Sequence, residues 1–233
     1  MSMKDGKDRL YLIWKSDKSR KQYVVGELTK NGGFEFHYKK EELEEALADG
    51  FKPLLCFEDF GRVYTNTKLF PVFSSRLPDR KRKDIEKILE KYNLKEYDEY
   101  LLLKRSGGRL PIDNFEFIDP ILDKDKKQTR IFCIAGARHY LGCVGEQCEN
   151  SVQVTRGDEV LLERDIENQH DKNAVKILTE KKDMLGYLPR YYSESVSYLL
   201  LHDVDIVCHI YSVDKGSNCN ECIRIKMDIN HKR

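Results

Sequence analysis

Apolar and polar residues alternate along the N-terminal part of the chain with the period of two that is typical of half-buried β-strands. The alternation is clearest at residues 10–14, 23–25 and 34–38, and polar or glycine-containing turns separate these segments. We therefore predict that an antiparallel β-meander opens the chain.

Helical periodicity follows. Residues 41–49 contain strong helix formers with acidic residues early and Gly50 directly after them, which predicts a short helix. Residues 83–92 place apolar side chains at three-to-four spacing and predict a second helix. Between them, residues 51–57 and 62–64 are apolar and aromatic, so we expect another hairpin there.

The C-terminal part alternates short apolar segments with polar loops. In chain order we expect a strand from residue 131, strands at 160–162 and 174–178 around a polar loop, a turn at 186–189, a helix at 193–201, and strands at 204–212 and 223–229. That order suits a small β-barrel with one helix.

A charged segment separates the two parts. Residues 119–130 are poor in apolar side chains after Leu122, so we expect a short linker there. The first domain is then expected at residues 8–118 and the second at 131–230. Together they predict an α+β protein.

Composition narrows the class of protein. The 233 residues are 40% hydrophobic and 35% charged, with a net charge of +1, which describes a soluble chain without global attraction to polyanions. No apolar run approaches the ~20 residues that cross a bilayer, and the first residues lack the apolar core of a signal peptide. Seven cysteines, an odd number, favour reduced thiols. We expect a cytoplasmic protein with no membrane partner.

A polar cluster lies between the two central C-terminal strands. The segment LLERDIENQHDKNAVKI at residues 161–177, followed by LGYLPR at 185–190, resembles the HIRAN domain, and IFCIAGARHY at 131–140 resembles that family's first strand and binding turn. The resemblance implies a small OB- or SH3-like barrel. It also implies a groove that grips the free 3′ end of single-stranded DNA. The residues placed in that groove by the resemblance are Arg138, His139, Tyr140, Asn168, His170, Asp171, Tyr187 and Arg190.

The resemblance implies separate roles for these side chains. Asp171 aligns with the carboxylate that meets the terminal hydroxyl, although an Asp in such a turn also bonds its own backbone. Arg138 is expected to bind phosphate through its planar guanidinium, or is a solvated charge at a strand end. His139 and His170 stand where the 3′-end binders carry tyrosines, and imidazole stacks on a base less strongly.

Charge is divided unevenly between the two parts. Residues 131–233 contain 13 Lys and Arg against 16 Asp and Glu, so this part carries about −3 and the remainder about +4. An acidic domain cannot rely on the counterion release that drives non-specific DNA binding. Recognition of an end through shape and stacking needs few phosphate contacts and remains compatible with this charge.

The N-terminal part carries a second, looser resemblance. The runs FPVFSSRLPD, LLLKRSGGR and DNFEF within residues 10–118 are similar to the N-terminal subdomain of HipA-type kinases. This resemblance implies a protein-interaction or regulatory module whose partner is a kinase, toxin or antitoxin protein. A basic cluster that includes Arg76, Arg80 and Arg82 is a solvated face, extends a phosphate path for DNA, or faces a protein partner.

No catalytic motif is recognisable. The sequence lacks the Asp and Asn set that a phosphotransferase needs to hold its metal, so we expect a binding protein without enzymatic activity or cofactor. Cys143 and Cys148 with the CxxC pair Cys219 and Cys222 leave a zinc site as an alternative to free thiols. The function we expect is nucleic-acid binding at single-stranded DNA ends. The alternative is a toxin–antitoxin type regulator that binds protein and not DNA.

Overall fold

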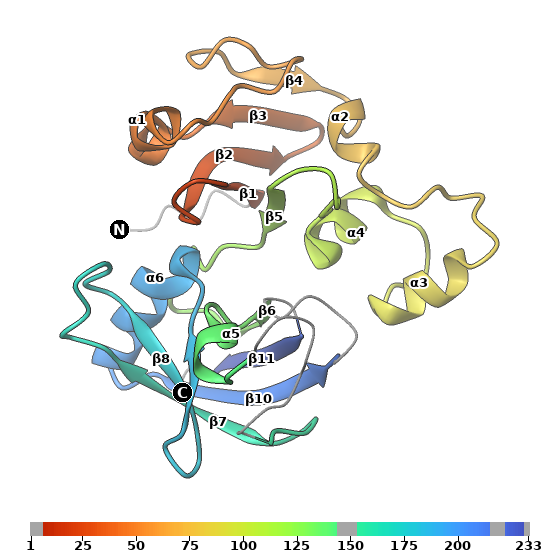
Figure 1. Ribbon diagram of the computed structural model, residues 1–233. Helices are drawn as coiled ribbons and strands as arrows, with labels where there is room; N and C mark the ends of the chain where they lie inside the picture. The colour runs from red at the N-terminus through yellow and green to blue at the C-terminus, as the bar shows by residue number, and fades with distance from the viewer. Residues whose placement is uncertain (1–6, 144–152, 215–221, 231–233) are drawn as a thin grey trace. The chain divides into compact units, whose positions relative to one another are not determined.

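The computed structural model describes residues 7–143, 153–214 and 222–230 (Figure 1). The chain divides into two compact units, Met1–Pro120 and Ile121–Arg233, and each is built on one antiparallel sheet. No helix in the described ranges has the length and apolarity needed to cross a membrane.

Unit 1 contains a five-stranded sheet in the order β4-β3-β2-β1-β5. Its strands are β1 (Asp8–Lys15), β2 (Gln22–Lys30), β3 (Phe34–Tyr38), β4 (Tyr64–Asn66) and β5 (Phe115–Ile118). The predicted meander is thus confirmed, and β2 is longer than the pattern indicated. Its second half continues the alternation of polar and apolar residues, with Leu28 between Glu27 and Thr29, although both Leu28 and Thr29 are buried.

The helices of unit 1 are α1 (Lys40–Ala48), α2 (Pro71–Ser74), α3 (Ile85–Lys91) and α4 (Glu99–Ser106). Both predicted helices, α1 and α3, are present. The Asp98 side chain caps α4 by accepting from the Leu101 amide at 2.8 Å, and Gly107 ends it at φ 75°. The core is rich in aromatic rings around the fully buried Phe36, which lies 4.6 Å from Phe57 and 5.2 Å from Phe73 between ring centroids.

The hairpin expected at residues 51–57 and 62–64 is wrong. Residues 51–57 form no strand, and only Tyr64–Asn66 pairs with β3. Phe51 and Phe57 are buried as separate anchors of an irregular loop, whereas Leu55 between them is 91% exposed. The apolar content of this segment therefore reflects two core contacts and not a strand face.

Unit 2 contains a six-stranded sheet in the order β6-β11-β10-β7-β8-β9. Its elements are β6 (Gln128–Cys133), α5 (Ala137–Tyr140), β7 (Glu159–Arg164), β8 (Val175–Thr179), β9 (Met184–Tyr187), α6 (Arg190–Leu201), β10 (Asp205–Val213) and β11 (Ile223–Asn230). Strand β6 begins inside the predicted linker, because residues 128–130 already pair with β11.

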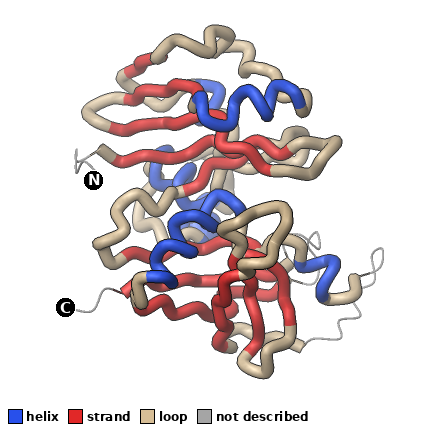
Figure 2. Tube along the Cα trace, turned by 90° about the vertical axis from the view of Figure 1, so that its left-hand side faces the viewer, coloured by secondary structure: helices blue, strands red, loops and turns tan. Residues whose placement is uncertain are grey.

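The sheet of unit 2 is curled, and its strands run in different directions in Figure 2. The predicted barrel is present as this half-barrel. One bridge joins its two edges: the amides of Ala135 and Tyr187 each donate to the other's carbonyl at 2.8 Å. Helix α6 covers β7 and β8, where the Arg164 guanidinium donates to the buried Ser197 hydroxyl at 2.7 Å.

The turn expected at residues 186–189 is wrong in its first half, because Gly186 and Tyr187 belong to β9, whereas Leu188 and Pro189 connect this strand to α6. Gly186 has φ 143°, and a Cβ on it would lie 2.6 Å from the Ala135 carbonyl oxygen. Glycine is required here for the close approach of two backbones at the closing bridge. A glycine inside an apolar segment predicts a turn when the contact with Ala135 is not visible in the sequence.

Candidate nucleic-acid interface

The polar loop between β7 and β8 is held by its own side chains. The Asn168 Oδ1 accepts from the amides of His170 and Asp171, both at 3.0 Å, and the Asp171 Oδ1 accepts from the Asn173 amide at 2.9 Å. The Asp165 amide donates to the Ala174 carbonyl at 2.8 Å and closes the loop. The loop therefore has a defined shape, and Asn168 and Asp171 contribute to it through local turns.

Asp165 fastens this loop to the sheet. Its Oδ2 accepts from the Tyr187 hydroxyl at 2.7 Å and from the Asn168 Nδ2 at 3.2 Å, and its Oδ1 lies 3.0 Å from the Lys176 ammonium. The hydrogen bonds from Tyr187 and Lys176 lower the pKa of Asp165. Burial and the Asp165 carboxylate raise the pKa of the Tyr187 phenol, so Tyr187 stays a hydrogen-bond donor. Three segments of unit 2 thus converge on one ionised carboxylate.

Sequence reasoning missed Asp165. It is the last charge in the run Glu163, Arg164, Asp165, and composition gives no reason to choose among the three. Only strand register distinguishes them, since Arg164 pairs opposite Val175 and Asp165 then falls beside the loop. The sequence feature that could have pointed to Asp165 is its position directly after a strand and before a polar loop.

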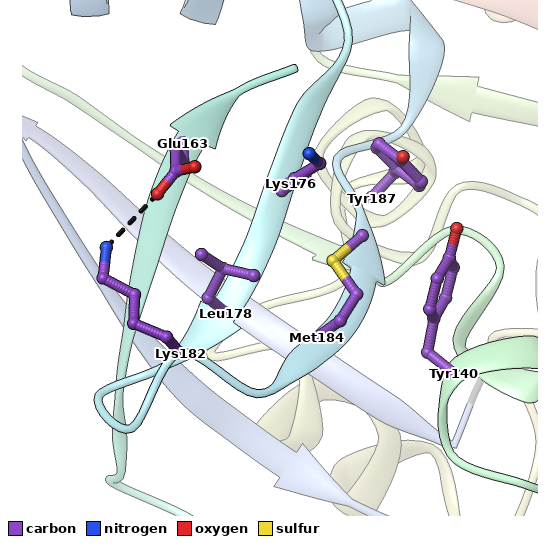
Figure 3. A pocket seen from close by; sticks show the side chains of 7 residues that line it. All are labelled: Tyr140, Glu163, Lys176, Leu178, Lys182, Met184 and Tyr187. Carbon is purple, nitrogen blue, oxygen red and sulfur yellow. Dashed lines mark hydrogen bonds and ion pairs between the residues drawn. The ribbon is translucent and has the colours of Figure 1, made fainter. Parts of the chain in front are cut away.

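An open groove lies beside this carboxylate (Figure 3). It has a volume of about 530 Å³ and is lined by Tyr140, Glu163, Lys176, Leu178, Lys182, Met184 and Tyr187. We call it the β7–β9 groove. Tyr140 and Tyr187 meet edge to face with ring centroids 5.9 Å apart, and Tyr140 is 40% exposed. Such a pair leaves an aromatic surface on which a planar ring can stack.

The residues suggested by the sequence fall into two sets. Tyr140, Asn168, Asp171 and Tyr187 belong to one connected arrangement centred on Asp165. The other four are exposed, and within the described part of the chain none has a side-chain hydrogen bond or ion pair. They are Arg138 and His139 on α5, His170 in the loop, and Arg190 at the start of α6.

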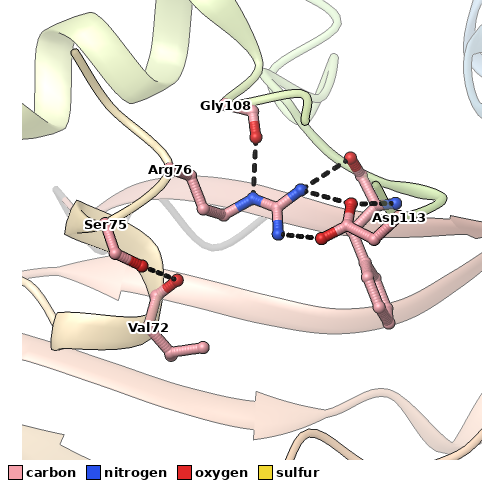
Figure 4. A network of polar contacts seen from close by, with 6 residues as sticks. Val72, Ser75, Arg76, Gly108 and Asp113 are labelled. Atoms are coloured by element: carbon pink, nitrogen blue, oxygen red, sulfur yellow. Dashed lines mark hydrogen bonds and ion pairs between the residues drawn. The ribbon is translucent and has the colours of Figure 1, made fainter. Parts of the chain in front are cut away.

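Arg76 is not available for a phosphate path, which corrects that prediction. Its side chain is 6% exposed, and its guanidinium forms a bidentate pair with Asp113 at 2.6 and 2.7 Å (Figure 4). It also donates to the carbonyls of Gly108 at 2.7 Å and Phe115 at 3.1 Å. Burial raises the pKa of Asp113, but the hydrogen bonds from Arg76 and the Phe115 amide outweigh it and lower the pKa overall. Arg76 therefore joins segments of unit 1 and has no exposed face for a ligand.

The two other arginines of that predicted path are near the surface of unit 1. Arg82 forms a bidentate pair with Asp84 at 2.7 and 2.9 Å. The guanidinium of Arg80 lies 6.0 Å from the centroid of the Tyr97 ring. Both arginines are exposed, and their contacts fit the alternative of a solvated charged face.

The proposed zinc ligands are only partly within the described residues. Cys148 and Cys219 lie outside them, whereas Cys143 and Cys222 are buried in unit 2. Across the described ranges no group of three or more His, Cys, Asp or Glu side chains is placed to hold a metal ion.

Comparison with known proteins gives a family match in unit 2. Residues 128–228 match the family described as the HIRAN domain. A Fanconi-associated nuclease 1 homolog from Arabidopsis thaliana is 34% identical over 85 residues, which is 36% of this chain and 9% of the relative. This chain therefore matches only a small part of the curated relative's length.

Two solved structures are weakly similar. The HIRAN domain of human HLTF aligns at TM-score 0.36 and 19% identity, over 45% of this chain and 77% of the other. A protein from Lactobacillus plantarum aligns at TM-score 0.33 and 19% identity, over 46% of this chain and all of the other.

The family match begins at residue 128, so the HipA-type resemblance of the N-terminal part stays a prediction. In the C-terminal part, the match covers the loop, the Tyr140–Tyr187 pair and Asp165 together. Residues 128–228 therefore carry a HIRAN domain, a type of domain associated with DNA binding.

Proposed function

We propose that the protein binds single-stranded DNA at its 3′ end through the HIRAN domain. The observation that carries the proposal is the attachment of the loop to Tyr187 through Asp165. The Asp165 carboxylate accepts at 2.7 Å from the Tyr187 hydroxyl, and the Tyr187 ring meets Tyr140 edge to face. A rigid polar loop and an aromatic pair are thereby joined in one site. Preorganised polar groups next to an aromatic surface are the features that single-strand recognition uses.

Each part of the site has a role in this proposal. The Asp171 Oδ1 is used by the Asn173 amide, whereas its Oδ2 meets no donor within the described residues and can accept from a terminal hydroxyl. Tyr140 offers its exposed ring to a base. Arg138, which is exposed on α5, supplies a cation for a phosphate.

The charge of this part of the chain supports an end-reading mode over general DNA binding. Residues 131–233 carry about −3, so a long duplex would gain little from counterion release. A strand end needs one or two local contacts and a stacking surface. The name of the Arabidopsis relative, a nuclease homolog, is consistent with a role on nucleic acid.

The test is fluorescence anisotropy with 5′-labelled oligonucleotides that end in a 3′ hydroxyl or a 3′ phosphate. The hydroxyl end should bind more tightly, by the worth of one charge-assisted hydrogen bond, roughly 1.5–3 kcal/mol. Asp171→Asn keeps an acceptor for the Asn173 amide but removes the negative charge, so it should bind the phosphate end more tightly than the parent does. Arg138→Ala should weaken both ligands alike. Equal affinity of the parent protein for both ends would contradict end recognition.

We propose that the site binds without turnover. This proposal is supported by the absence of a recognisable nucleotide or metal-carboxylate motif in the sequence. Phosphate release or strand cleavage that follows the protein peak through two purification steps would contradict it.

We propose unit 1 as a protein-interaction or regulatory module, with a kinase, toxin or antitoxin protein as partner. This proposal is supported by two exposed apolar side chains, Leu55, which is 91% exposed, and Val63, which is 56% exposed. They lie near a cavity of about 450 Å³ that Val63, Phe57 and Phe70 help to line. Exposed apolar patches mark interaction sites. A partner that co-purifies with the parent chain should be lost with Leu55→Lys plus Val63→Lys, and retained with Leu201→Lys in unit 2.

A further inference from the structure

The β7–β9 groove continues well beyond the residues that the sequence suggested. Three of its lining residues lie in one line across three strands: Glu163 pairs opposite Lys176, and Lys176 pairs opposite Tyr187. Only the Tyr187 end of this line belongs to the proposed end site. The remaining groove surface has no role in that proposal.

We infer that a bound single strand continues from the Tyr140–Tyr187 pair across β8 to β7, and that Lys182 contacts its phosphate after releasing Glu163. This inference rests on the proposed binding of single-stranded nucleic acid. It adds a second subsite and identifies Glu163 as an anion that competes with the ligand for Lys182.

The groove has the chemistry of a stacking surface. Leu178 and Met184 form an apolar floor between the tyrosines and the lysines (Figure 3). They lie on the face of the sheet opposite Val175 and Ile177, which are fully buried in the core. Bases pack on such apolar and polarisable side chains without sequence preference, while cations at the rim follow the backbone.

Lys182 is held in position by a defined turn. The Lys182 amide donates to the Thr179 carbonyl, and the Thr179 amide donates to the Asp183 carbonyl, both at 2.9 Å. Within this turn Lys182 adopts φ 68°, and its side chain runs along the edge of the groove to Glu163 on β7 (Figure 3). The turn thus holds the Lys182 backbone, whereas the ammonium at the end of the side chain is exposed.

The pair between Lys182 and Glu163 is suited to exchange. Its atoms are 3.2 Å apart, and the two side chains are 61% and 52% exposed. Exposed pairs of this kind contribute about 0–1 kcal/mol, so a phosphate can replace the carboxylate. Lys176 differs, because its partner Asp165 is buried and also holds Tyr187. Of the two lysines that line the groove, Lys182 is therefore the one that exchanges its anion.

The dimensions set the length of strand involved. From β9 to β7 there are two interstrand spacings, about 10 Å in all, which corresponds to about three nucleotide steps at the stacked rise of 3.4 Å. A trinucleotide held at the end site spans only two such steps, about 7 Å, and therefore stops short of Lys182. A strand of eight or more nucleotides covers it.

The experiment compares 5′-labelled oligothymidylates of three and ten nucleotides, both with a 3′ hydroxyl, by fluorescence anisotropy on the full chain. Lys182→Gln should weaken the ten-nucleotide ligand about fivefold and reduce its salt slope by roughly 0.7, as expected for one lost phosphate contact on a single strand. The three-nucleotide ligand should be unaffected. Glu163→Gln should act in the opposite direction and tighten the longer ligand.

Lys181→Gln is the matched control, because Lys181 is the exposed neighbour of Lys182 and does not line the groove. If both ligands bind the parent equally and Lys182→Gln behaves like Lys181→Gln, the second subsite is overturned while DNA binding stands. If Glu163→Gln weakens binding as Lys182→Gln does, the carboxylate is not a competitor. If neither oligothymidylate binds, the proposed function fails together with this inference.

Discussion

Replacement of Asp165 by Asn should loosen the polar loop between β7 and β8 without unfolding unit 2. The carboxylate accepts from Tyr187, Asn168 and Lys176. Asn keeps one carbonyl acceptor for the Tyr187 hydroxyl but turns an amide donor toward the Lys176 ammonium. A hydrogen bond to a charged group contributes roughly 1.5–3 kcal/mol when buried, and the partly exposed lysine contributes less. We therefore expect local opening of the loop to become easier by about 2 kcal/mol.

Hydrogen exchange read by mass spectrometry measures this directly. At 1.36 kcal/mol per tenfold, amides in residues 165–174 should exchange roughly thirtyfold faster in Asp165→Asn, whereas peptides from β10 and β11 should keep their rates. Glu194→Gln removes the same charge from an exposed position on α6 and should change neither. Unchanged loop exchange in Asp165→Asn would show that the turns made by Asn168 and Asp171 hold the loop alone.

The same variant has a pH signature. The pKa of Asp165 is lower in the folded protein than its ordinary value, so its stabilising contribution is complete above that ordinary value, about pH 4, and is lost as the pH falls through the lowered one. The parent loop should therefore exchange faster, relative to the intrinsic rate, as the pH is lowered below about 4. Asp165→Asn should lack that acid-dependent step.

Three further predictions concern other positions. Arg76→Gln should destabilise unit 1 by about 3 kcal/mol, because it removes a buried guanidinium that bonds Asp113 and the carbonyls of Gly108 and Phe115. Urea unfolding with the single tryptophan, Trp14 of β1, as the probe measures this change, and Arg82→Gln, which breaks an exposed pair, should leave the unfolding midpoint unchanged. Gly186→Ala should destabilise unit 2 by about 1–3 kcal/mol, since its Cβ would lie 2.6 Å from the Ala135 carbonyl oxygen. Gly157→Ala is the control, because Gly157 also has a positive φ but open space around it. Thermal unfolding of the two variants therefore separates the steric clash from the backbone strain. Replacement of both His139 and His170 by Ala should weaken the binding of a single strand, because imidazole rings at these exposed positions can stack on a base, and unchanged anisotropy titrations of the double variant would remove both from the site.

Much of the fold follows from local pattern. Period-two alternation located β1, β3, β10 and β11, and three-to-four spacing located α3. The wrong predictions concern residues that contact a segment distant in sequence. Phe51 and Phe57 anchor a loop to an aromatic core, and Gly186 permits a backbone approach by Ala135. Neither contact has a local period, so neither is visible before the chain is folded.

The same distinction between local pattern and distant contacts applies to the candidate site. Family resemblance pointed to Asn168, Asp171 and Tyr187, but their mutual geometry depends on Asp165, whose neighbours come from β8, β9 and the loop. Arg76 was chosen from a run of basic residues, and its burial against Asp113 depends on a partner 37 positions away. A charge run in sequence does not reveal which member is exposed.

The acidic character of residues 131–233 gains a local explanation from the same contacts. Both lysines that line the β7–β9 groove face a carboxylate of the chain itself, Lys176 with Asp165 and Lys182 with Glu163. Neutralised cations attract long polyanions weakly, so under the proposed function the groove would select ligands that also supply stacking and a matching end. The pair of Lys176 with Asp165 holds the loop, and the exposed pair of Lys182 with Glu163 would set how strongly a phosphate must compete. On this proposal the negative charge of the HIRAN domain would restrict binding to strands that fit the groove, and it would not oppose nucleic-acid binding as such.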